Sequence, residues 1–216
     1  LKKNEGLTQL GSGISDAYVF SDELDAEVTF NLLKKGKYFV ARYPTQGKCR
    51  CEQSGLKKKE AFLIPLSGFG DMDRMPEDVL NMFYRDIKVL LSETSAKSVH
   101  LRAHPNTKGR STEYLRDFLL SKGIDAVCVS AEKPINEIMC DYLGMAGQAT
   151  NSLRDGRASC DYTLVIGFAA LGRLFSPNPR FSFGNSEGIG WIEADGSYDK
   201  NIFKRQKYIS VPRKSI

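Results

Sequence analysis

The side chains best suited to proton transfer and anion binding are concentrated in one short stretch. His100, Arg102 and His104 alternate there with three apolar residues, which is the pattern of a β-strand with one polar face. Both histidines of the chain lie on that face. Pro105 cannot donate to a neighbouring strand and favours an extended residue before it, so the strand is expected to end with the His104 imidazole at its carboxyl end. Open α/β sheets bind ligands at that end.

Composition is ordinary for a globular protein. The chain has 216 residues, of which 41% are hydrophobic and 26% charged, enough for one large domain with a real core or for one and a half. The net charge of +5 suits an anionic ligand or an anionic membrane surface, and we expect no nucleic-acid partner. No apolar run approaches the ~18 residues that cross a bilayer. Five irregularly spaced cysteines predict reduced thiols in a cytoplasmic protein.

Strand-like and helix-like segments alternate along the chain. This order predicts a Rossmann-like parallel sheet with flanking helices and right-handed crossovers. The expected strands of the main unit are 61–66, 98–104, a buried 126–129 and 162–167. The expected helices begin at Pro76, near Ser111, at Pro134 and at Phe168.

The helix from Pro134 is expected to carry Ile138, Met139, Tyr142 and Leu143, before a polar loop over 148–159.

The segment before this unit is shorter and more polar. Strands are expected at 17–20 and 38–41, with a helix from about Asp22 between them. An N-terminal segment, residues 1–60, ends in a solvated linker over 43–60 and precedes a main domain, residues 61–216. Because the chain begins with Leu1, we expect a fragment that lacks part of an N-terminal domain.

Four segments in order give a resemblance to a known family. They are the stretch 62–67, His104-Pro105, the stretch 134–139 that opens a helix with Glu137, and the stretch 164–171 that ends a late strand, with a thinner match at Asn4-Glu5-Gly6. This set resembles the donor-binding half of bacterial GT-B sialyltransferases and polysialyltransferases, which use CMP-sialic acid. The resemblance covers about residues 62–174 and implies transfer of sialic acid, or a related acidic sugar, to a glycan hydroxyl.

The resemblance implies a role for each matched residue. His104, assisted by Arg102 and followed by Pro105, would donate to the phosphate of the leaving CMP, where negative charge develops. The alternative is a structural histidine bonded to the backbone, which is our interpretation of His100. Glu137 would accept hydrogen bonds from the ribose hydroxyls. It could equally be a first-turn glutamate that suits the helix dipole.

Two matches depart from the family pattern. The family has a Ser-Ser pair where this chain has Ala169-Ala170, so only backbone N–H groups of the turn that begins at Phe168 could hold the phosphate. Glu5 would be the general base that deprotonates the acceptor, or else a solvated terminal glutamate. The alanines also leave open a CMP-Kdo enzyme or a non-catalytic nucleotide- or glycan-binding domain.

Metal and cofactor chemistry are not expected. Asp71-Met72-Asp73 has the spacing of a metal-binding motif in another glycosyltransferase class, but we interpret it as a turn. A UDP- or GDP-sugar GT-B transferase remains an alternative, whereas an oxidoreductase is disfavoured because no G-x-G-x-x-G turn follows a strand. The acceptor would be a glycan or lipid-linked glycan, and the lysines at 57–59 would suit peripheral contact with an anionic inner membrane.

Overall fold

The computed structural model describes residues 17–20, 37–40, 58–66, 75–104, 110–148, 152–156, 159–167, 189–193 and 195–204. The chain divides into two compact units, the first made of Leu1–Gly47 and Leu171–Ser186 and the second of Lys48–Ala170 and Glu187–Ile216. In the first unit, strands β1 (Ala17–Phe20) and β2 (Lys37–Val40) pair in parallel, as a two-stranded sheet. Both strands were expected from the sequence.

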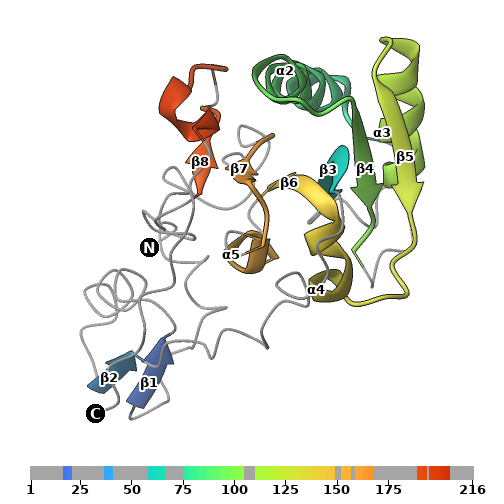
Figure 1. The fold of residues 1–216 in the computed structure, drawn as a ribbon. Coiled ribbons are helices and arrows are strands. Elements are labelled where there is room, and N and C mark those ends of the chain that lie inside the picture. Colours follow the sequence, from blue (N-terminus) through green and yellow to red (C-terminus); the bar gives the residue numbers. More distant parts are fainter. Residues whose placement is uncertain are drawn as a thin grey trace, which may run out of the picture. The chain divides into compact units, whose positions relative to one another are not determined.

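The second unit is built on a six-stranded sheet in the order β5-β4-β3-β6-β7-β8 (Figure 1). All five strand pairings are parallel. The first strand in sequence lies inside the sheet, the next two extend the sheet on one side of it, and the last three extend it on the other. This is the Rossmann-like arrangement that the sequence predicts. The strands are β3 (Lys59–Pro65), β4 (Ser98–Arg102), β5 (Asp125–Val129), β6 (Tyr142–Gly147), β7 (Tyr162–Val165) and β8 (Gly190–Trp191).

The helical elements are of two kinds. Two are long enough to bury a full apolar face, namely α2 (Glu77–Glu93) and α3 (Ser111–Ser121). The others make one turn or little more: α4 (Ile135–Ile138), the 3-10 turn η4 (Met139–Asp141), α5 (Ser152–Gly156) and the 3-10 turn η5 (Lys200–Phe203).

The two long helices pack against one face of the sheet. Helix α2 follows Pro76, whose fixed φ suits a helix start, and buries Val79, Leu80, Phe83, Ile87 and Leu90, as its 3.6-residue spacing predicts. Helix α3 adds Leu115 and Leu119. These side chains form one core with the alternate strand residues Phe62, Ile64, Val99 and Leu101.

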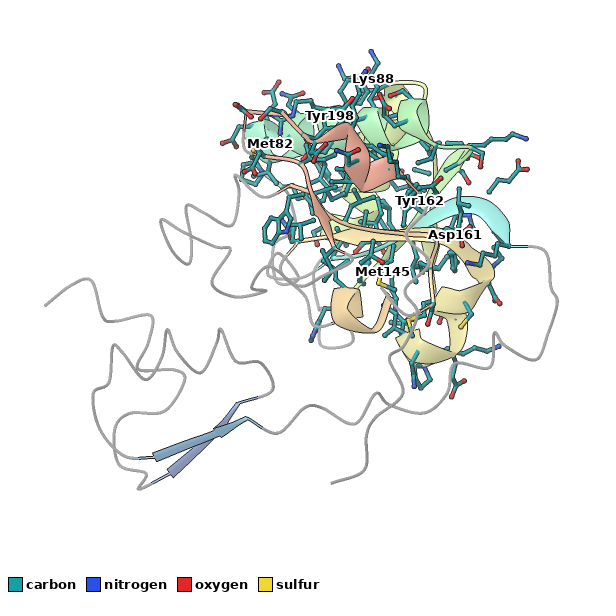
Figure 2. All side chains as sticks on the ribbon, turned by 60° about the vertical axis from the view of Figure 1, so that its left-hand side comes forward. Met82, Lys88, Met145, Asp161, Tyr162 and Tyr198 are labelled. Atoms are coloured by element: carbon teal, nitrogen blue, oxygen red, sulfur yellow. The ribbon has the colours of Figure 1, made fainter. Side chains whose placement is uncertain are left out.

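The short elements α4, η4 and α5 pack against the opposite face, whereas Phe203 of η5 joins the core on the side of α2 and α3. Ala61, Leu63 and Met145 point to this side and form a second core with residues of η4 and α5. Figure 2 shows Met145 on the side of α5 and Tyr162 on the other side of the sheet, toward α2. Both faces of the middle of the sheet are therefore covered, which is why the central strands β3 and β6 are buried along nearly continuous runs.

The sequence-based prediction for Tyr142–Leu143 is wrong. The helix that follows Pro134 ends at Ile138, and after one 3-10 turn the chain enters β6 in the middle of the sheet. Every residue of β6 is buried, so the strand lacks the polar alternation that would have revealed it. At Gly144 a Cβ would overlap the ring of Phe62, so the strand needs a glycine where it passes that side chain.

Strand β5 is at the edge of the sheet and is not buried as expected. Ala126 is inside, but Val127 is 44% exposed because β5 has a neighbour only on the β4 side. Strand β4 ends at Arg102, two residues before the predicted end at His104. Strand β3 begins at Lys59, inside the predicted linker.

The expectation of reduced thiols is also wrong at Cys140, which is disulfide-bonded, whereas Cys128 and Cys160 are free.

Several predicted segments lie outside the described residues. They are the helix from Asp22, most of the linker over 43–60, the Asp71–Asp73 turn and the short helix from Phe168. Within the described part of the chain, no helix combines the length and the apolar character that crossing a bilayer requires.

Candidate functional site at the carboxyl edge of the sheet

All six strands end at one edge of the sheet because they run in the same direction. The strand order reverses between β3 and β6, while β4 lies on the other side of β3. Ligands of open α/β sheets bind at the carboxyl ends of the strands on either side of such a switch point. The backbone stays paired up to this edge, since the Leu66 N–H donates to the Arg102 carbonyl (2.9 Å) and the Ile166 N–H to the Gly147 carbonyl (2.9 Å).

Arg102, the last residue of β4, is buried with 4% of its surface exposed. Its Nη2 donates to the carbonyl oxygens of Ala131, at 3.1 Å, and of Lys133. These carbonyls belong to the loop that leads from β5 to α4. Its Nη1 has no hydrogen-bond partner among the described residues. Burial lowers the pKa of the guanidinium, but an arginine keeps its charge at neutral pH, so a buried cation with one free donor group stands at this strand end.

His104 lies two residues beyond β4 and is exposed. The two histidines of the predicted polar strand face therefore differ in their surroundings. His104 reaches the surface at the carboxyl edge, as predicted, while His100 is half-buried and its Nδ1 is hydrogen-bonded to the Tyr142 hydroxyl at 3.0 Å. This bond fits our interpretation of His100 as structural. Pro105 lies outside the described residues.

Glu137 is exposed in the first turn of α4, and its backbone N–H donates to the Pro134 carbonyl at 3.1 Å. Arg102 holds the carbonyls just before Pro134, so the end of β4 is tied to the start of α4. The structure thereby links the strand that precedes His104 to the loop that precedes Glu137.

A buried carboxylate holds the turn after β7. Asp86 of α2 is completely buried, and its Oδ2 accepts a hydrogen bond of 2.8 Å from the Gly167 N–H. Its Oδ1 is paired with Arg85, whose Nη2 also donates to the Glu193 carbonyl at 3.3 Å. Gly167 has φ +62°, a conformation that favours glycine. The turn is fixed at the point where the stretch Phe168-Ala169-Ala170 begins, although that stretch and Glu5 lie outside the described residues.

Asp86 was missed by the sequence analysis although a signal was present. It lies three residues after Phe83 and four before Leu90, on the apolar side of the helix, where a charged side chain is unusual. Desolvation raises the pKa of its carboxyl, partly offset by the Gly167 N–H and by Arg85. Only a specific partner makes such a position tolerable.

Unpartnered polar atoms gather at this edge. Among the described residues, five buried side-chain atoms lack a hydrogen-bond partner: Arg102 Nη1, Thr112 Oγ1, Gln148 Oε1, Gln148 Nε2 and Thr163 Oγ1. Four of the five belong to residues at the carboxyl edge, since Thr112 is in the first turn of α3 and Gln148 directly follows β6. Buried polar groups are normally paired, so this part of the molecule offers hydrogen bonds that a ligand could complete.

No protein-family model matches the chain, and no curated protein matches it either.

Proposed function

We propose that this chain is the donor-binding part of a glycosyltransferase. The enzyme would move sialic acid, or a related acidic sugar, from its CMP conjugate to a hydroxyl of a glycan or lipid-linked glycan. The observation that carries the proposal is the link through Arg102 between the end of β4, near His104, and the start of α4, with Glu137. This link supports a shared site for the matched residues at the edge where Rossmann-like sheets bind nucleotides.

Each group at the edge suits one part of a CMP-sugar. His104 and the free Nη1 of Arg102 can donate hydrogen bonds to a phosphate, while the carboxylate of Glu137 can accept them from ribose hydroxyls. In the reaction the acceptor oxygen attacks the anomeric carbon, the bond from that carbon to the phosphate oxygen breaks, and CMP leaves with the bonding electron pair. His104 would stabilise the charge on CMP, and Glu5 would take the proton of the acceptor hydroxyl.

Binding can be dissected with parts of the donor. In calorimetric titrations of the 216-residue chain, we expect CMP to bind and cytidine to bind more weakly. His104→Ala should weaken CMP about tenfold or more, as for the loss of one charge-assisted hydrogen bond, and leave cytidine unchanged. Glu137→Gln should weaken both, because both contain the ribose.

Two variants control for nonspecific charge effects. Lys88→Ala changes an exposed cation in the middle of α2, and Asp125→Asn changes an exposed acid at the opposite edge of the sheet. Neither should alter CMP affinity. Absence of CMP binding, or stronger binding of UDP or GDP, would refute the proposal.

A second candidate function is a non-catalytic nucleotide- or glycan-binding domain. The observation that favours it is the Ala169-Ala170 pair, which removes the two hydroxyls that the family offers to the phosphate. Incubation with a CMP-sugar and acceptor separates the two, since an enzyme releases CMP and transfers the sugar. Tight CMP binding without release would support the binding domain.

A further inference from the structure

Gln148 has a buried side-chain amide that is not satisfied within the described part of the chain. The residue has no exposed surface, and neither its Oε1 nor its Nε2 has a hydrogen-bond partner there. A buried amide without partners destabilises the folded state, because these atoms were hydrogen-bonded to water before folding. A methionine or leucine of similar size would avoid that cost. Among the described residues, the amide therefore makes no hydrogen bond that stabilises the fold.

The position of Gln148 relates this amide to the proposed donor site. Gln148 follows the last residue of β6, which pairs with β3 on the side away from β4. Arg102 ends β4 on the other side. Neighbouring strands are about 4.8 Å apart, so the backbones at these two positions are separated by about 10 Å across the switch point. A nucleoside monophosphate has the length to extend from one to the other.

The chemistry of the two groups differs in a way that orients such a ligand. Arg102 presents a cationic donor, which suits the phosphate. A primary amide is neutral and planar, with a donor and an acceptor side by side, and therefore matches a base edge that offers the complementary pair. A phosphate offers acceptors alone and would leave Oε1 unpaired. Gln148 consequently suits the base end of the nucleotide.

We propose that Gln148 is a specificity-determining residue that recognises the cytosine of the donor, with Oε1 accepting from the N4 amino group and Nε2 donating to N3. This inference rests on the proposed function, because it assumes a cytidine nucleotide at this edge. It adds a base contact that the resemblance does not assign.

The test is the variant Gln148→Met, titrated with CMP and with ribose 5-phosphate, which lacks the base. CMP affinity is expected to fall about 10- to 100-fold, the range for losing a bidentate base contact, while ribose 5-phosphate affinity stays the same. In the absence of ligand the variant is expected to melt at the same temperature as the wild type or a higher one, because the unpaired amide is gone. A glutamine with a purely structural role would give the reverse pattern.

Thr163→Val is the matched control. It also removes an unpartnered buried polar group, but from within β7 rather than from the strand ends, and should leave CMP affinity unchanged. Equal CMP affinity in wild type and Gln148→Met would overturn this inference and leave the proposed function standing. A Gln148→Met variant that melts lower or fails to fold would overturn it as well. Failure of the wild type to bind CMP would refute both.

Discussion

Asp86 gives the sharpest test of how the carboxyl edge is held. Replacing it with alanine leaves the buried Gly167 N–H without its acceptor and removes the partner of Arg85. A hydrogen bond to a charged group contributes about 1.5–3 kcal/mol, and a buried donor left unpaired costs about 1–3 kcal/mol. The side chain of Arg85 is 35% exposed and can return to water, which limits its share. The first two energies both describe the lost hydrogen bond between Asp86 and the Gly167 N–H, so they are not added in full. We expect Asp86→Ala to lower the free energy of unfolding by about 2–4 kcal/mol.

The chain contains a matched control for this change. Asp117 is paired with the preceding Arg116 in the same geometry, at 2.7 Å between Nη2 and Oδ1, but its side chain is 61% exposed and bonds to no backbone amide in the described part of the chain. Urea denaturation monitored by circular dichroism would compare the two alanine variants. Asp117→Ala should change stability little, since exposed ion pairs are weak. Equal losses at both positions would refute the reasoning.

Asparagine at position 86 separates the hydrogen bond from the charge. Its Oδ1 can still accept from Gly167, so Asp86→Asn should stay within about 1 kcal/mol of the wild type. Burial raises the pKa of the Asp86 carboxyl above its ordinary value. A raised pKa contributes stability that is present below the ordinary value, about 3.9, and is lost as the pH rises through the folded value. As the pH rises through the folded pKa of Asp86, the free energy of unfolding of the wild type should therefore fall relative to that of the asparagine variant. A difference between the two proteins that does not change with pH would contradict the raised pKa.

Three further predictions concern the interior. Burial lowers the pKa of His100, so its contribution to stability should be present above pH ~6.5 and lost as the pH falls through the folded pKa. The melting temperatures of the wild type and His100→Gln should therefore converge as the pH is lowered. A difference in melting temperature that stays the same at every pH would argue against this. Gly144→Ala should lower the free energy of unfolding by about 1–3 kcal/mol in urea titrations, because the methyl overlaps an aromatic ring, and an unchanged midpoint would show that β6 can shift. Burial raises the pKa of Cys160 to about 12, so iodoacetamide at pH 8 should modify it, by peptide mass spectrometry, only after denaturation; equal labelling before and after would contradict its burial.

The sequence predicted the sheet and its helices where a simple period was present. Helix α2 and strands β3, β4 and β7 were found because their apolar spacing was clear. Strand β6 was mistaken for part of a helix, because a strand covered on both faces shows no alternation and the short α4 directly precedes it. The exposed edge strand β5 was read as buried for a related reason, since its apolar sequence does not tell which strand lies outermost.

The candidate site was predictable only in part. His104 and Glu137 could be assigned to a strand end and a helix start, and in the structure His104 follows β4 and Glu137 lies in the first turn of α4. The partners that fix that edge could not be predicted, because Arg102 bonds to carbonyls about thirty positions away and Asp86 to an amide 81 positions away. Such contacts depend on the order of strands in the sheet, which local patterns do not specify.

The bond between Arg102 and the loop before α4 also limits how this protein can vary in sequence. Surface loops generally tolerate insertions and deletions. The loop at 130–134 differs, because the carbonyls of Ala131 and Lys133 are the acceptors of a buried guanidinium that belongs to another strand. A one-residue change in loop length would move one carbonyl out of reach and leave the cation short of an acceptor. Loop length and the residue at position 102 are therefore expected to change together among related sequences, whatever side chains the loop itself carries.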